Sequence, residues 1–477
     1  DLLVFFGLFI SAAFPLAVSA ARADFFKNNS HLIDDNVPRL SYGVAVADLN
    51  GNNTPEFVVT GFGYPNLALE ISNGRLSNSL SNSLFSDAQR KTIGVAACDV
   101  DGDGMEEVYF LNTDAYSGEK VLADRLLDFG PEPYDLFEQG DNSVNLNLTA
   151  GRSVACVDRK GDGQYGIYVS NYGGPSRFYE VDGTEVEDIS IQLGIDRTTG
   201  GRAVVSGHIL GSRNDILAAN ERGANFLYQN IDGRFLDRAV EYGVDDTTQN
   251  GRGTALADIL YDGRLGIIIG NWNGYHRVYV PLRNSFLDYA TDEFREPSKV
   301  RTVISADFDN DGYDEIFFNN IGQPNRMFRV REGGLLEPVL LSAALEANGL
   351  GTGAAVADID NDGVLDLLVA HGERAPQPLS LFRADIDSPG RYLRIAPLTG
   401  NGAPARGATV ILETNMRVHA KTIDAGSGYL CQMEPVAHYG LRTGEVIKSV
   451  SVRWTDGSEN EVTVITENTV NTIRKEG

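Results

Sequence analysis

The chain has 477 residues, which is too many for one ordinary hydrophobic core and enough for a large repeat domain with a smaller one. Its 66 acidic residues outnumber its 40 basic residues, giving a formal charge of −26. This charge argues against nucleic acid and anionic membrane as partners and fits a protein that collects cations, although solubility alone accounts for much of it.

The first predicted element is a secretory signal over residues 1–23. An apolar run from Leu2 to Val18 is followed by small residues, which indicates cleavage after Ala20 or Ala23. A signal anchor is the alternative. Because position 1 is Asp, we expect the true start to lie upstream. We expect no later segment to cross a bilayer. Acceptor sequons for glycosylation occur at Asn28, Asn52 and Asn147, but Asn52 also falls at a predicted metal-ligand position.

A nine-residue acidic loop recurs along the chain, at residues 48–56, 99–107, 307–315 and 358–366. Side chains at loop positions 1, 3 and 5 converge on one point, which a carbonyl from position 7 and a carboxylate from position 9 can complete. Six to eight oxygen ligands at one point suit calcium better than magnesium. Glycine at position 6 permits the sharp turn, so we expect positive φ at Gly104, Gly312 and Gly363.

We therefore predict three calcium sites and a possible fourth. The ligands of the three are Asp99, Asp101, Asp103, Met105 and Glu107; Asp307, Asp309, Asp311, Tyr313 and Glu315; and Asp358, Asp360, Asp362, Val364 and Asp366. The softer fourth set, which has fewer charges and no glycine at position 6, is Asp48, Asn50, Asn52, Thr54 and Glu56.

Three further segments keep the spacing with altered ligands, at residues 158–166, 207–215 and 258–266. In the first of them Lys160 takes position 3. We expect its ammonium at the loop centre, where it would pair Asp158 and Asp162 in place of a metal ion; the alternative is a lysine that points to solvent. Seven copies at a period near fifty residues indicate a propeller or another repeat array.

Each repeat predicts four strands, with the acidic loop between the first and the second. We therefore predict an all-β fold in which residues 24–388 form a seven-bladed β-propeller. The flanking strands exclude EF-hands, which need helices on both sides of the loop. Residues 24–33 should supply the fourth strand of the last blade, because the third strand would otherwise be an unpaired edge.

The three cysteines are Cys98, Cys156 and Cys431. Cys98 and Cys156 lie one and two residues before their loops, so alternation along a strand would point them in opposite directions. We expect buried free thiols there rather than a bridge.

The composition changes at residues 385–390, and residues 389–477 lack metal loops. Short strands with glycine turns predict a small β domain. The repeats resemble the FG-GAP/VCBS repeats of integrin α-subunit heads. The C-terminal segment resembles the ASPIC/UnbV domain, through residues 401–408, 426–441 and 452–457. Together, and with residues 150–161, they resemble the cartilage acidic protein family.

This resemblance implies a secreted, glycosylated, calcium-binding protein of extracellular matrix or cell-surface recognition and adhesion. Its partner would be an extracellular or cell-surface protein or glycan. Vertebrate members carry a cysteine-rich EGF-like segment after this domain. The sequence ends at Gly477 without one, so the resemblance does not extend to a vertebrate-type partner and suggests an invertebrate, microbial or truncated form.

Catalytic signals are weak. The six histidines show no zinc-ligand spacing, and no GxSxG motif or phosphate loop occurs. We expect His438 to be a packed histidine with Glu434 as its candidate partner. Trp272, Tyr275 and Tyr279 fit a blade core or, alternatively, stacking against carbohydrate. Two functions stay open: a non-enzymatic, calcium-stabilised recognition scaffold, and a propeller enzyme or lectin acting on extracellular glycans or phosphoesters.

Overall fold

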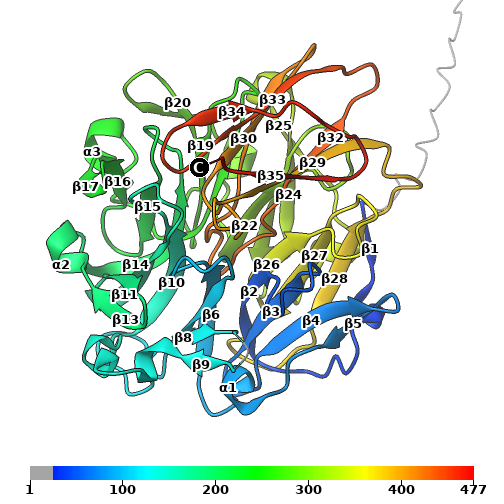
Figure 1. The fold of residues 1–477 in the computed structure, drawn as a ribbon. Coiled ribbons are helices and arrows are strands. Elements are labelled where there is room, and N and C mark those ends of the chain that lie inside the picture. The colour runs from blue at the N-terminus through cyan, green and yellow to red at the C-terminus, as the bar shows by residue number, and fades with distance from the viewer. Residues whose placement is uncertain (1–24, 131, 477) are drawn as a thin grey trace, which may run out of the picture.

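The computed structural model describes residues 25–130 and 132–476, so the predicted signal segment lies outside the described residues. The fold is all-β, as predicted. Seven four-stranded antiparallel blades surround a central axis, and the strands of the C-terminal domain, orange to red in Figure 1, gather on one side of them.

The seven blades follow the chain, and the last one takes its outer strand from the N-terminus. Blade one is β2 (Ser41–Ala47), β3 (Glu56–Gly61), β4 (Leu67–Ser72) and β5 (Arg75–Asn78). Blade two is β6 (Thr92–Cys98), β7 (Glu107–Asn112), β8 (Arg125–Asp128) and β9 (Tyr134–Asp135). Blade three is β10 (Gly151–Val157), β11 (Gly166–Pro175), β12 (Arg177–Asp182) and β13 (Glu185–Asp188). Blade four is β14 (Thr198–Gly207), β15 (Asp215–Asn220), β16 (Phe226–Ile231) and β17 (Arg234–Asp237).

Blade five is β18 (Gly251–Ala257), β19 (Gly266–Asn271), β20 (Arg277–Pro281) and β21 (Phe286–Asp288). Blade six is β22 (Val300–Ala306), β23 (Glu315–Asn320), β24 (Arg326–Val330) and β25 (Leu336–Pro338). Blade seven is β26 (Gly351–Ala357), β27 (Asp366–His371), β28 (Ser380–Ala384) and β1 (Phe26–Asn28). Blades three and four also pair with each other, through β11 and β14.

Helices are short and lie between strands. They are α1 (Ser83–Ser86), α2 (Ser190–Leu193), α3 (Ala239–Tyr242) and α4 (Asp292–Arg295), with 3-10 turns η1 (Ser30–Leu32), η2 (Leu136–Glu138), η3 (Asn142–Asn145), η4 (Glu332–Gly334) and η5 (Ala343–Leu345). Within residues 25–130 and 132–476, none of these helices has the length and apolarity that a membrane span requires.

The predicted ring closure is confirmed. Strand β1 pairs antiparallel with β28, with Phe26 opposite Ala384 and Asn28 opposite Phe382. Phe26 is 1% exposed and packs edge-on against Phe308 of blade six. The N-terminal strand therefore covers the backbone edge of β28 and contributes to the core between the last two blades.

The predicted free thiols at Cys98 and Cys156 were wrong, because these residues form a disulfide with their Cα atoms 6.3 Å apart. At equivalent positions of one strand the two side chains would point to opposite faces of the sheet. Neighbouring blades pack face to face, so a contact between them joins opposite faces of two sheets. A one-residue offset between β6 and β10 is therefore the offset that a bridge needs. Cys431 is a buried free thiol.

The C-terminal strands form two sheets, one of β29 (Arg391–Leu398), β32 (Ala437–Leu441) and β35 (Val470–Arg474). The other consists of β30 (Thr409–Thr414), β31 (Val418–Thr422), β33 (Ile447–Arg453) and β34 (Glu459–Glu461). Strand β29 does not pair with β28.

The segment between β31 and β32 enters the centre of the propeller. Gly428 and Thr254 exchange backbone hydrogen bonds of 2.6 and 2.8 Å, and Gln432 exchanges two of 3.0 Å with Val44 and Val46. A Cβ on Gly43 of β2 would lie 2.6 Å from the carbonyl oxygen of Leu430, so that inner strand needs glycine there. Residues 424–434 thus fill the axis that the inner strands surround.

Candidate metal centre

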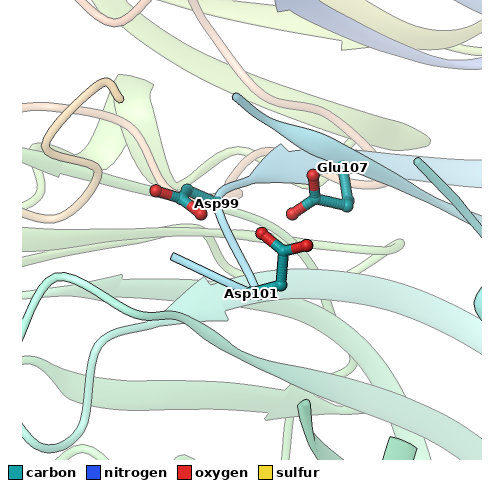
Figure 2. Close-up of side chains that lie close together, drawn as sticks. All are labelled: Asp99, Asp101 and Glu107. Carbon is teal, nitrogen blue, oxygen red and sulfur yellow. The ribbon is translucent and has the colours of Figure 1, made fainter. Parts of the chain in front are cut away.

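The acidic loops follow the inner strands and gather their carboxylates. Three groups of carboxylates have ligand atoms within 4.8 Å of one another: Asp99, Asp101 and Glu107; Asp307, Asp309 and Asp311; and Asp358, Asp360 and Asp362. Figure 2 shows the first group, with its carboxylates turned toward one another. The predicted ligands Asp103, Glu315 and Asp366 lie outside these groups.

The loops share one backbone conformation. Gly104, Gly312 and Gly363 have φ of 95°, 82° and 87°, which confirms the positive φ expected at position 6. Asn53 replaces glycine in the first loop and also has positive φ, 63°, which asparagine tolerates better than most residues. Position 4 is left-handed as well, for instance at Asn310, a constraint that the sequence analysis missed.

The same hydrogen bonds recur inside each loop. The position 6 amide donates to the position 1 carboxylate, over 3.1 Å from Gly104 to Asp99 and 2.9 Å from Gly363 to Asp358. The position 7 amide of Met105, Tyr313, Val364 or Thr54 donates to the position 5 side chain. The backbone thus holds the acids at one point before any ion binds.

The loop at 99–107 is the most complete candidate. Among the described residues, no cationic side chain forms an ion pair with Asp99, Asp101 or Glu107. Burial raises the pKa of Asp99 to about 7, although two backbone amides oppose the shift. Burial and the nearby Asp101 raise the pKa of Glu107 to about 9, and its buried Oε1 has no hydrogen-bond partner. A divalent cation would relieve this repulsion.

An arginine from outside the loop, which the sequence analysis did not identify, reaches the carboxylates of the loop at 307–315. Arg329 of β24 pairs with Asp309 and Glu315, and lies 3.2 Å from Asp311. Even so, burial raises the pKa of Asp307 to about 8, and Oδ1 of that residue has no partner. The group can hold a cation if the guanidinium moves aside.

The loop at 358–366 has two such arginines. Arg383 of β28 pairs with Asp360 over 3.0 Å and also with Asp362, and Arg394 of β29 pairs with Asp358 over 2.7 Å. Oδ2 of Asp366 is buried without a partner. Arg329 and Arg383 both lie on the third strand of their blade, between 20 and 25 residues after the loop begins, and this repeated spacing could have been found in the sequence.

In the loop at 48–56 the side-chain amides already have hydrogen-bond acceptors. Asn50 donates to Glu56 over 2.7 Å, and Asn52 donates to Glu70 over 2.8 Å. Burial raises the pKa of Glu56 to about 7. This loop has the same backbone conformation as the other three, but fewer charged side chains.

The expected role of Lys160 was wrong. Its side chain is about half exposed and lies 3.0 Å from Glu180, not between Asp158 and Asp162. The carboxylate of Asp158 instead accepts a 2.5 Å hydrogen bond from the hydroxyl of Thr455 in the C-terminal domain. A residue of another domain, which spacing inside the loop cannot reveal, occupies this partner position.

Comparison with known proteins covers both parts of the fold. Residues 35–110 and 307–369, which contain all four acidic loops, match the family described as FG-GAP-like repeat. Residues 398–477 match the family described as ASPIC and UnbV. Cartilage acidic protein 1 of Homo sapiens is 46% identical, over 89% of this chain and 70% of that protein. The Xenopus tropicalis protein of the same name is 44% identical, over 89% and 72%.

The chain belongs to the cartilage acidic protein family. Its fold is also similar to that of the BP39L lectin from Burkholderia pseudomallei, at a TM-score of 0.50 and 13% identity, over 72% of this chain and 99% of the lectin. That likeness concerns the fold alone.

In this member of the cartilage acidic protein family, the ASPIC/UnbV domain contacts the acidic loops directly. The Gly440 amide donates to Asp307 over 2.8 Å, and the ring of His438 lies 2.6 Å from Asn310. His438 is packed and buried as expected, but the partner suggested for it was wrong: Glu434 pairs instead with Arg394 over 2.6 Å.

Two other sequence predictions change with the structure. The Asn147 sequon is 0% exposed, and its amide donates to Asp124 and Asn171, which leaves no room for a glycan. Of the three aromatic residues, only Tyr279 is buried in the blade core; Tyr275 is exposed, and Trp272 lies against Arg252 and Arg301.

Proposed function

We propose that this protein is a secreted, non-enzymatic scaffold for extracellular matrix or cell-surface recognition, and that bound calcium stabilises its propeller. The observation that carries the proposal is the group formed by Asp99, Asp101 and Glu107, which converges without a cationic side chain from the described residues. Carboxylates held in this way, next to carbonyl groups and water, are the ligands that calcium prefers.

The other loops rank below this one. The groups at 307–315 and 358–366 have the same backbone, but Arg329 and Arg383 compete with an ion for their carboxylates. The loop at 48–56 has the fewest charges, and lower charge weakens calcium binding. We expect affinity to fall in the order 99–107, then the two arginine-bearing loops, then 48–56.

The extracellular assignment has two supports besides the family. The Cys98–Cys156 bridge is of the kind that persists in oxidising compartments. The predicted signal segment is the second. The arrangement of the acidic residues does not favour catalysis. The clustered carboxylates all lie in the loops, and several of them pair with arginines. Among the described residues, none of them accepts a hydrogen bond from a serine, threonine or cysteine side chain.

Calcium stoichiometry tests the proposal. After chelation and dialysis into millimolar calcium, we expect about three ions per chain by elemental analysis. Asp99→Asn should remove one ion, and Asp232→Asn, a change of equal charge at a highly exposed residue, should remove none. A chain that binds no calcium, or an Asp99→Asn variant that keeps every ion, would contradict the proposal.

A further inference from the structure

Four arginines occupy one repeated position at the end of the propeller axis away from the acidic loops. Arg152, Arg202, Arg252 and Arg301 each lie five residues before the last residue of the inner strand, in blades three to six. Five strand residues span about 16 Å, so these side chains are far from the loops. The same position holds Tyr42, Ile93 and Thr352 in the other blades.

A register shift occurs at each arginine. The pairing of β10 with β11 skips Arg152, and the pairings of β18 and β22 skip Arg252 and Arg301 in the same way. The pairing of β14 with β15 skips Arg202 together with Ala203. A bulge redirects the side chain that it contains. The four guanidiniums thereby line one pocket of about 440 Å³, which lies within the range of small-ligand sites.

Aromatic rings alternate with the arginines. Arg152 and Arg202 lie 5.4 and 5.7 Å from the ring of Tyr116, and Arg252 and Arg301 lie 4.8 and 4.6 Å from Trp272. Tyr429 also faces this group; it lies in the axial segment, residues 424–434 of the C-terminal domain, which fills the propeller axis. Stacking on ring faces allows buried guanidiniums to lie close to one another.

The acids beside the pocket do not use all its donors. Glu221 pairs with Arg202 and Arg252, Glu373 pairs with Arg301, and the exposed Asp114 lies on the rim. Within the described residues, Arg152 has no carboxylate partner and donates only to the carbonyl groups of Gly151 and Tyr116.

Several nitrogens in the pocket therefore lack a partner. Arg152, Arg252 and Arg301 are each at least nine-tenths buried. Their Nε atoms have no hydrogen-bond acceptor in the described chain. An unpaired buried donor is costly, and a charged one more so. A bound anion would supply the missing negative charge.

The charge of the pocket shows in its neighbours. Burial opposes ionisation of Tyr429, yet the four guanidiniums lower its pKa to about 8. Burial, together with Arg252, lowers the pKa of Arg301 to about 9. A strongly acidic protein thus keeps an electropositive pocket at one end of its axis.

We propose that this pocket binds the carboxylate or sulfate group of an acidic saccharide. Guanidiniums bind such oxyanions through paired N–H donors, and the ring of Tyr116 offers a flat apolar face for the sugar, while Tyr42 and Trp272 also line the pocket. Tyr116 is 66% exposed and so lies at the entrance. The inference rests on the recognition role proposed above but does not depend on calcium at the loops.

The test is calorimetric titration of the full chain in calcium, with defined probes. These are a chondroitin sulfate tetrasaccharide, a hyaluronan tetrasaccharide, a neutral chitin tetrasaccharide, sodium sulfate and a tetraglutamate peptide. We expect one or both acidic saccharides to bind and the neutral one not to bind. Chondroitin sulfate carries both groups and hyaluronan carries only carboxylates. Binding of both saccharides therefore indicates recognition of the carboxylate, and binding of chondroitin sulfate alone indicates recognition of the sulfate.

Arg152→Gln should weaken that binding about tenfold or more, because one charge-assisted contact is lost, and it leaves no acid unpaired. Arg283→Gln, at an exposed arginine on another surface, is the matched control and should stay within about twofold. Tyr116→Ala is the second variant. Its ring is mostly exposed, so it should fold normally and still lose affinity.

Four results would overturn the proposal: no binding of either acidic saccharide, binding that both pocket variants leave unchanged, tighter binding of the tetraglutamate peptide, or equal binding of sodium sulfate and the saccharides. The calcium dependence of the melting temperature, measured on the same samples, separates the two ideas. If that dependence persists while saccharide binding fails, the pocket assignment falls and the calcium proposal stands.

Discussion

Arg406 of the C-terminal domain forms a buried, two-pronged ion pair with Glu106, which lies next to the last ligand position of the second-blade loop. Its Nε and Nη2 atoms lie 2.7 and 3.2 Å from the two carboxylate oxygens, and Arg406 is 0% exposed. The same guanidinium donates to the carbonyl groups of Val46 and Met433. One side chain therefore joins two blades to the axial segment.

Replacing Arg406 should be severe. Arg406→Met leaves Glu106 buried without a counter-charge, so we expect a loss of about 3–5 kcal/mol in the free energy of unfolding. Chemical denaturation measures it. The double variant Arg406→Met with Glu106→Gln should recover part of the loss. A single variant within about 1 kcal/mol of the parent protein would show that the pair does not hold the domains.

Calcium removal should lower stability. Extracellular sites bind with dissociation constants of about 0.1–1 mM, and a tenfold excess of ion adds about 1.4 kcal/mol per site. Three sites give about 4 kcal/mol, a large part of a domain's net stability. Scanning calorimetry in EDTA and in millimolar calcium checks this. Equal melting temperatures in the two buffers would contradict it.

Gly312→Val should abolish one calcium site. Its φ of 82° is strained for a β-branched residue, and a Cβ there would lie 2.7 Å from Arg442 Cγ. We expect one ion fewer per chain and a cost of about 1–3 kcal/mol. Gly322→Val, on an open turn of the same blade with φ of 60°, is the control: it carries similar strain and should keep every ion.

Arg329→Met should strengthen calcium binding at the loop 307–315. The guanidinium pairs with three of its carboxylates, so an ion must displace it, and methionine keeps much of the packing without the charge. Calorimetric titration should show a lower dissociation constant for one site. A weaker site in the variant would mean that Arg329 organises the ligands instead.

Breaking the Cys98–Cys156 bridge should destabilise the propeller. The bridge spans 58 residues and joins the inner strands of blades two and three, so its loss frees a long loop in the unfolded chain. We expect Cys98→Ser with Cys156→Ser to cost about 2–4 kcal/mol. Cys431→Ser, at the buried free thiol, controls for the loss of sulfur alone.

The repeat spacing predicted much of this fold, because the strands and the loop of each blade come from one continuous segment of about fifty residues. The prediction that residues 24–33 close the ring is confirmed by the pairing of β1 with β28. Its reason is a general one, that an unpaired strand edge is unfavourable. The positive φ at Gly104 and Gly312 also followed from local chemistry.

The errors concern contacts between repeats and between domains. The face of a strand that meets its neighbour blade depends on blade packing, so the bridge between Cys98 and Cys156 could not be inferred within one strand. Lys160 pairs with Glu180, and Asp158 accepts from Thr455, 297 residues later in the chain, a contact between domains that spacing within the loop does not show. Asn310, not Glu434, lies beside His438 for the same kind of reason.

The sequence by itself determined the seven-fold repeat, the strand order and the acidic loops, because these depend on local spacing and backbone preference. It also determined the closing strand, because the last repeat would otherwise leave an unpaired strand edge. Only the tertiary structure decided which arginines enter the loops, which loops meet the C-terminal domain, and that Arg152, Arg202, Arg252 and Arg301 converge on one pocket. Residues about fifty positions apart become neighbours only when the ring closes, and their charges then act together at short range.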